Sequence, residues 1–256
     1  MRLAAMQPYF FPYIGYFQLI NAADRFILYS DIDYIRHGWI NRNRIKQKGY
    51  SFIYITVPVH MKRQIRIKDV YIDETTPRWH YKIIQSIRLN YRQSPYFDEI
   101  FPLIEQGLSG GSPCSIAVLN ETSIRIIADY LDIRTEIFSD IGRYPGLENT
   151  LSRMDTDGYK DLSRYKEKQV ARIQVRPLEF CRLEGADTYI NPIGGTKLYD
   201  KKLFLHYGVN LQFVQTDAIQ YPQKEKPFIP NLSIIDVLMQ NGKEKTKELL
   251  SCYTLI

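Results

Sequence analysis

The residues best suited to ligand chemistry lie in one basic segment, Arg36–Arg44, which combines arginines, a histidine, a tryptophan and amides. Arginine suits phosphate because its planar guanidinium donates paired, charge-assisted hydrogen bonds, and an indole ring can stack on a sugar or a base. His37 is a candidate general base, since histidine readily exchanges protons under physiological conditions. The candidate binding residues here are Trp39, Asn41, Arg42, Asn43 and Arg44. A solvated basic loop without a ligand is the alternative interpretation.

A second candidate segment, Met6–Gln18, is rich in aromatic residues and contains two prolines. Prolines reduce the entropy cost of holding a loop in one shape, while aromatic rings offer flat faces for a sugar or a base. The sequence therefore predicts a preorganised pocket wall, and its candidate binding residues are Gln7, Tyr9, Tyr13 and Tyr16. A hydrophobic plug over the end of a sheet is the alternative, because many such aromatic residues belong to the core.

Two carboxylates, Asp31 and Asp33, follow a predicted strand. Many glycosyltransferases place Asp-x-Asp there to hold a divalent metal against a nucleotide-sugar diphosphate. The spacing also arises often by chance, so we expect a solvated or capping role and no metal site. Asp31 is the second candidate base.

The third candidate segment is Gly185–Tyr199, in which a paired glycine follows a predicted strand. Glycines allow backbone amides to approach a ligand closely, and nearby side chains would add polar contacts. The candidate residues are Asn191, Gly194, Gly195 and Lys197. Neither a Walker nor a dinucleotide-binding fingerprint is present, and a tight turn without a ligand is an equal alternative.

The elements that must position these residues begin with a strand at Arg2–Met6, a helix at Ile14–Ala23 and a strand at Arg25–Ser30. Such a unit normally joins two parallel strands, and ligands bind beyond their carboxyl ends. The first two candidate segments would both lie there.

Further along, β-branched and aromatic residues predict a strand at Ser51–Val59 with an antiparallel partner at Ile65–Ile72. Residues 77–131 are mostly helical in pattern, divided at Ser94-Pro95, and Lys160–Leu183 reads as a helix interrupted near Pro177. Strands at Thr135–Phe138, Thr188–Asn191 and Asn210–Val214 and helices at Leu198–His206, Ser233–Asn241 and Lys243–Leu250 complete the pattern. The fold class is α/β, with a mixed, largely parallel sheet, a Rossmann-like opening and an inserted helical region.

Tyr13-Ile-Gly-Tyr16 occupies a position comparable to the His-x-Gly-His of nucleotidylyltransferases, which leaves a nucleotidylyltransferase-like arrangement open. Both histidines are replaced by tyrosine, which donates a hydrogen bond but adds no positive charge. We therefore take this similarity as a suggestion about fold and not about adenylyl transfer.

Composition places the chain among ordinary globular proteins, since 45% of its 256 residues are hydrophobic and 24% are charged. We expect a single domain over residues 1–256, located in the cytoplasm, because no apolar run of about 18 residues and no signal-peptide pattern is present. Cys114, Cys181 and Cys252 are expected to be free thiols.

The charge distribution suggests an anionic partner. The net charge is +6, and Arg36–Lys68 contains nine Lys or Arg and no Asp or Glu. A nucleotide-linked sugar or another phosphorylated small molecule would suit it, whereas no sequence-specific nucleic-acid reader motif is present. A homo-oligomer is left open, and whether a cofactor is used is unknown from the sequence.

Four stretches closely resemble the WbqC-like family: Met6–Ile20, Gly38–Arg44, Thr188–Gly195 and Leu232–Met239. The similarity extends over nearly the whole chain. The resemblance implies a bacterial protein associated with O-antigen and other surface polysaccharides, often beside enzymes that make amino sugars. Asp33 stands where relatives more often have Asn or Gln, which argues against a required metal site at Asp31 and Asp33.

The function expected from residues and resemblance together is modification of a nucleotide-linked amino sugar, by transfer of an acyl or aminoacyl group to its amine. His37 or Asp31 would accept the ammonium proton, because only the uncharged amine is nucleophilic. A glycosyltransferase that uses a nucleotide sugar is one alternative. A non-catalytic binding partner of the polysaccharide machinery is another.

Overall fold

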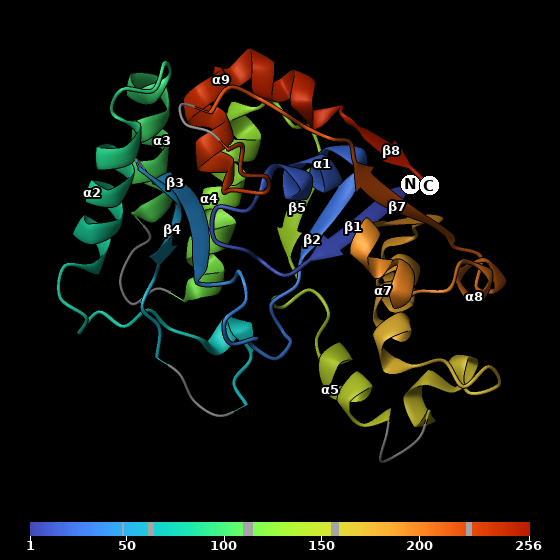
Figure 1. Cartoon of the computed structure of the whole chain (residues 1–256). Helices are drawn as coiled ribbons and strands as arrows, with labels where there is room; N and C mark the ends of the chain where they lie inside the picture. The colour runs from blue at the N-terminus through green and yellow to red at the C-terminus, as the bar shows by residue number, and fades with distance from the viewer. Residues whose placement is uncertain (48, 61–63, 110–114, 155–158, 224–226) are drawn as a thin grey trace.

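The computed structural model describes residues 1–47, 49–60, 64–109, 115–154, 159–223 and 227–256. Figure 1 shows their arrangement. The strands are β1 (Arg2–Met6), β2 (Arg25–Leu28), β3 (Arg42–Gln47), β4 (Tyr50–Thr56), β5 (Glu136–Ser139), β6 (Thr188–Pro192), β7 (Asn210–Thr216) and β8 (Tyr253–Leu255). The α-helices are α1 (Ile14–Ala22), α2 (Trp79–Tyr91), α3 (Phe97–Leu108), α4 (Ile116–Tyr130), α5 (Leu147–Ser152), α7 (Arg172–Glu184), α8 (Lys201–His206) and α9 (Ile234–Leu250). Short 3₁₀ helices cover Ile67–Asp69, Lys160–Tyr165 and Ile193–Lys197.

Six strands form one sheet in the order β5-β2-β1-β6-β7-β8, and only β8 is antiparallel to its neighbour. The predicted α/β class with a largely parallel sheet is confirmed. From β1 the chain continues to β2 on one side, whereas β6 adds to the other side of β1. The strand order therefore reverses between β1 and β6, and ligands in open α/β sheets bind at such a point.

Successive side chains along each strand point to opposite faces of the sheet, and both faces are buried, as is usual for parallel sheets. On one face Ala4 and Ile190 join the cluster formed with α1, α4, α9 and the β3–β4 hairpin. On the other face Leu3 and Tyr189 pack with α7 and α8. In Figure 1 the hairpin and α2–α4 lie on one side of the sheet, and α5, α7 and α8 lie on the other.

One predicted strand pairing is wrong. Ser51–Val59 does not pair with Ile65–Ile72; its main strand, β4, pairs with β3. Ile65–Ile72 instead contains the 3₁₀ helix Ile67–Asp69 and meets its predicted partner at one bridge, between Val59 and Ile72; its other bridges join Arg66 to Asp33 and Tyr71 to Ser115. The strand β3 was not predicted, because Arg42–Gln47 is mostly polar and lacks the apolar pattern of a buried strand. In the structure Asn43, Ile45 and Lys46 are nevertheless buried.

The helical region at 77–131 is confirmed as α2, α3 and α4, with Ser94-Pro95 between the first two. The expected interruption near Pro177 is wrong, because α7 runs through Pro177. A proline inside a helix removes one hydrogen bond and crowds the carbonyl four residues before it, but the burial of Leu178 and Phe180 offsets this cost and the helix stays continuous. No helix within the described ranges is both long and apolar enough to span a membrane.

The predicted break between two C-terminal helical segments is also confirmed. Gly242 within α9 adopts φ 64° and ψ −165°, which divides the helix as expected. A Cβ added to Gly242 would lie 2.4 Å from the Tyr96 ring. Both the backbone conformation and the close approach therefore require glycine.

We predict that Gly242→Ala lowers the free energy of unfolding by about 1–3 kcal/mol, because the methyl group meets Tyr96 in a backbone region that L-residues avoid. Urea unfolding followed by circular dichroism would measure the change. Gly194→Ala is the control, since a Cβ there meets nothing within 4 Å. Equal stability of the two variants would contradict the prediction.

Candidate functional site

The aromatic loop after β1 and the basic segment before β3 lie against each other. The Phe10 amide donates to the Trp39 carbonyl at 2.9 Å. The Asn43 side-chain amide, which is only 3% exposed, donates to the carbonyls of Phe10 and Phe11 at 3.0 and 2.7 Å. The convergence expected from the sequence is therefore present.

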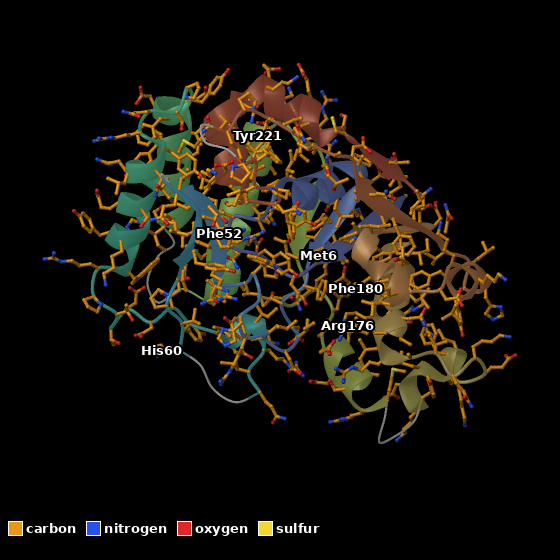
Figure 2. The ribbon with its side chains drawn as sticks, viewed as in Figure 1. Met6, Phe52, His60, Arg176, Phe180 and Tyr221 are labelled. Carbon is orange, nitrogen blue, oxygen red and sulfur yellow. The ribbon has the colours of Figure 1, made fainter. Side chains whose placement is uncertain are left out.

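Between the two segments lies a cavity of about 300 Å³, which we call the aromatic–arginine cavity. Its lining residues are Tyr9, Pro12, Tyr13, Trp39, Asn43, Arg44 and Asn231. In Figure 2, Met6 at the end of β1 lies between Phe52 of the hairpin and Phe180 of α7, which locates the carboxyl end of the sheet near the centre of the molecule.

Arg44 supplies the positive charge of this cavity. Its guanidinium stacks 5.3 Å from the Trp39 ring centre and 4.9 Å from that of Phe52, which holds it by cation–π contacts. One terminal nitrogen donates to the Asn231 carbonyl at 3.3 Å, while the buried Nε has no partner. No carboxylate within the described ranges forms an ion pair with Arg44, so the guanidinium retains unused charge for an anion.

The tyrosines of the loop divide into two kinds. Burial raises the pKa of Tyr9 and Tyr13, so both phenols stay neutral and can donate hydrogen bonds without repelling an anion. Tyr16 is fully buried; its hydroxyl donates to the Gln7 carbonyl at 2.9 Å, and its ring lies 5.6 Å from that of Tyr9. Tyr16 therefore supports the cavity wall without lining it.

Two other predicted binding residues brace the basic segment. The Asn41 side chain accepts from the Tyr34 hydroxyl and donates to the Val57 carbonyl. Arg42 donates to the carbonyls of His37 and Gly38. Neither residue lines the cavity.

The two candidate bases stand in different surroundings, and neither lines the cavity. Asp31 forms ion pairs with Arg66 at 2.7 Å and Lys68 at 2.6 Å. Burial raises the pKa of Asp31, but the hydrogen bonds and charges of Lys68 and Arg66 outweigh it, so the pKa lies below its usual value. His37 is exposed, and its side chain has no bonding partner among the residues described.

The third predicted segment contains β6, the strand next to β1, so the end of this strand lies at the same edge of the sheet as Gln7. Gln7 and Asn191 are each 7% exposed. A Cβ on Gly195 would lie 1.8 Å from the Asn191 side-chain nitrogen, so this glycine makes room for that amide. Gly194 and Lys197 are exposed. None of these residues lines the aromatic–arginine cavity.

Similarity to known proteins covers nearly the whole chain. The profile of the WbqC-like protein family matches residues 7–248. The chain belongs to the WbqC-like family. An uncharacterized protein of Mycobacterium tuberculosis, Rv1507c, is 27% identical over 254 residues, which is 98% of each chain. No solved structure is significantly similar to this WbqC-like protein.

Sequence reasoning missed three residues that build the site of this WbqC-like protein. Asn120 on α4 donates to the carbonyls of Pro8 and Ile40, and nothing in its helical surroundings indicates this role. The Ser233 hydroxyl donates to the Phe11 carbonyl, and the Ser233 amide donates to the Arg44 carbonyl. Its position before a helix, within a family-like stretch, was the available signal. Asn231 lines the cavity two residues earlier.

We predict that Asn43→Asp destabilises the protein by about 1–3 kcal/mol, because a carboxylate would face two buried carbonyls that now accept hydrogen bonds. Thermal and urea unfolding would measure the loss. Asn210→Asp is the matched control, because this substitution introduces the same charge at an exposed residue. A loss no larger than that of the control would refute the role of Asn43.

Asp31 provides a pH-dependent prediction. Its pKa is lower in the folded state than in the unfolded chain, so the carboxylate stabilises the fold at neutral pH and this contribution is lost as the pH falls. Asp31→Asn should therefore cost about 1 kcal/mol at pH 7 and less near pH 3. Urea unfolding at both pH values would test the difference, and an equal cost at both would contradict it.

Proposed function

We propose that this chain binds a nucleotide-linked amino sugar in the aromatic–arginine cavity and transfers an acyl or aminoacyl group to the sugar amine. The observation that carries the proposal is the meeting of neutral tyrosines, Trp39 and an arginine that forms no ion pair with a described carboxylate around one cavity. The WbqC-like family, through its association with surface polysaccharides, supports an amino sugar as the substrate class.

The phosphate portion of the ligand is assigned to Arg44. Its Nε donor has no partner and its charge is not neutralised by any described carboxylate, whereas a phosphate oxygen could accept charge-assisted hydrogen bonds from the guanidinium. The cation–π contacts with Trp39 and Phe52 hold the guanidinium in place before a ligand arrives, which reduces the entropy lost on binding.

The ring of the ligand is assigned to Tyr9, Tyr13 and Trp39. Aromatic faces contact the apolar face of a sugar or the plane of a base, and the phenol hydroxyls can bond to sugar hydroxyls. Because burial keeps both tyrosines neutral, they add polarity without a negative charge near the phosphate. A cavity of about 300 Å³ suits a part of a nucleotide sugar, with the remainder in the opening.

The chemical step requires a free amine. The sugar nitrogen attacks the acyl carbon, a C–N bond forms, and the bond between the acyl carbon and the leaving group of the donor breaks. The ammonium proton passes to a base. We assign that role to His37, which does not line the cavity itself but stands two residues before the lining residue Trp39. Asp31 is disfavoured because its carboxylate is held by Arg66 and Lys68.

The test is incubation of the purified protein with UDP-glucosamine or a dTDP-linked 4-amino sugar and a panel of acyl and aminoacyl donors, with product detected by mass spectrometry. We expect a mass gain equal to the transferred group. Arg44→Gln should weaken nucleotide-sugar binding by about 10- to 100-fold, because a charge-assisted hydrogen bond is lost. His37→Gln should lower kcat with little effect on binding.

Arg134→Gln is the matched control, because Arg134 is exposed and precedes β5, at the opposite end of the sheet. It should bind the nucleotide sugars as the unchanged protein does. Absence of both binding and product across the donor panel would refute the proposed function. Binding without product would favour the non-catalytic alternative.

A further inference from the structure

The β3–β4 hairpin has a buried face and an outer face of a different character. Ile45 and Ile55 lie in the core on the buried face. Because side chains alternate along a strand, the residues between them point outward, and Arg44 lies directly across from Tyr54. The outer face carries four side chains that we call the hairpin stack: Arg42, Arg44, Phe52 and Tyr54. Phe52 is labelled in Figure 2.

Within the hairpin stack, each arginine lies over the aromatic ring diagonally across from it. The Arg42 guanidinium carbon is 4.7 Å from the centre of the Tyr54 ring, and that of Arg44 is 4.9 Å from the centre of the Phe52 ring. The two rings are 5.7 Å apart. Both guanidinium groups therefore lean the same way along the hairpin, and their charges lie side by side at about the two-residue spacing of a strand, roughly 7 Å.

These two neighbouring charges have no carboxylate between them. The groups that accept hydrogen bonds from Arg42 are the His37 and Gly38 carbonyls, and Arg44 donates to the Asn231 carbonyl. Neither arginine forms an ion pair with a carboxylate of the described ranges. Like charges held this close repel each other, and an anion placed between them would relieve the repulsion and accept charge-assisted hydrogen bonds.

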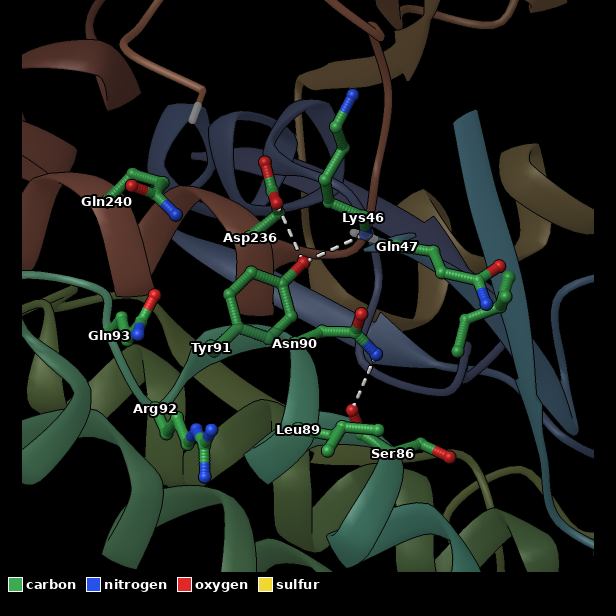
Figure 3. A pocket seen from close by; sticks show the side chains of 11 residues that line it. Lys46, Gln47, Ser86, Leu89, Asn90, Tyr91, Arg92, Gln93, Asp236 and Gln240 are labelled. Carbon is green, nitrogen blue, oxygen red and sulfur yellow. Dashed lines mark hydrogen bonds between the residues drawn. The ribbon is translucent and has the colours of Figure 1, made fainter. Parts of the chain in front are cut away.

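The third cation of β3, Lys46, differs because its charge is balanced. Figure 3 shows Lys46 beside Asp236. Burial raises the pKa of Asp236, whereas hydrogen bonds from neighbouring donors and the positive charge of Lys46 oppose that rise. Among the cations of β3, the missing counter-charge is thus confined to Arg42 and Arg44.

Aromatic surface flanks this pair of charges on two sides. The Tyr54 ring is 46% exposed, and an exposed ring offers a flat face on which a base can stack. On the other side the Arg44 guanidinium also lies 5.3 Å from the Trp39 ring, which lines the aromatic–arginine cavity. The hairpin stack therefore continues into that cavity through Arg44.

We propose that the hairpin stack is a subsite for a nucleoside diphosphate, in which Arg42 and Arg44 hold the two phosphates and Tyr54 stacks against the base. The attached sugar would then enter the aromatic–arginine cavity beside Arg44. This inference rests on the proposed function for the sugar, and it adds the second phosphate and the base. The diphosphate of a nucleotide sugar carries one negative charge on each phosphate, which matches the two arginines that lack a counter-charge.

Isothermal titration calorimetry with UDP and UMP tests the subsite. We expect UDP to bind one-to-one and at least about tenfold more tightly than UMP, which lacks the second phosphate. Arg42→Gln should weaken UDP binding by about tenfold or more, since it removes a charged partner. Arg134→Gln is the matched control, because it removes the same charge from an exposed residue outside the hairpin.

The stacking role of Tyr54 has its own variants. Tyr54→Ala should weaken UDP binding by about tenfold, whereas Tyr54→Phe keeps the ring and should bind as the unchanged protein does. Tyr81→Ala, at an exposed tyrosine of α2, is the control. Because the Tyr54 side chain is largely on the surface, this series remains decisive if Arg42→Gln does not fold.

Equal affinity for UDP and UMP, or unchanged UDP binding in Tyr54→Ala, would overturn the inference. Tighter binding of an eight-nucleotide RNA than of UDP would also overturn it, because the face would then suit single-stranded nucleic acid. The outcome is separable from that of the proposed function. UDP binding that depends on Arg42 and Tyr54, without any acyl transfer, would support the subsite and count against the transfer, whereas transfer that Tyr54→Ala leaves unchanged would do the reverse.

Discussion

The candidate site depends on buried carbonyl groups that the aromatic loop cannot satisfy by itself. The loop between β1 and α1 lies mostly in the interior, and Pro8 and Pro12 have no N–H to form regular structure. Unpaired buried carbonyls would be costly. Side chains from three distant segments bond to them instead: Asn43 to Phe10 and Phe11, Asn120 to Pro8, and Ser233 to Phe11.

The same three residues also fix the basic segment, to which Asn43 itself belongs, so the loop and the segment are positioned together. Asn120 also donates to the Ile40 carbonyl, and the Ser233 amide donates to the Arg44 carbonyl. Arg44 and the tyrosines thus face one cavity because one set of hydrogen bonds holds both walls. Ile234 adds a bond to the Pro12 carbonyl, which ties the start of α9 to the same loop.

How far the sequence could predict this arrangement depends on the range of the interactions involved. The β1–α1–β2 unit and the division of α9 at Gly242 follow from local patterns of apolar residues, prolines and glycines, and both were predicted. The strand β3 was not, because its polar residues are buried by partners outside the segment. Asn120 lies 112 residues from Pro8, and no local pattern marks such a contact. The meeting of Tyr9 and Arg44 was predictable because both follow adjacent parallel strands, although the lining residue Asn231 was not.

The strand β3 then connects the aromatic–arginine cavity with another cavity, of about 610 Å³, which lies where the β3–β4 hairpin, α2 and α9 meet. One edge of β3 pairs with β4, and the other edge is fastened by Ser233 at the Arg44 carbonyl and by Tyr91 at the Lys46 amide. Arg44 lines one cavity and Lys46 lines the other, two residues apart on the same face of the strand. Because Ser233 caps α9 and Asp236 lies in its first turn, a shift of that turn must alter the walls of both cavities. Ser233 and Asp236 are both buried, so their polar groups must be paired, and the same hydrogen bonds hold parts of the walls of both cavities.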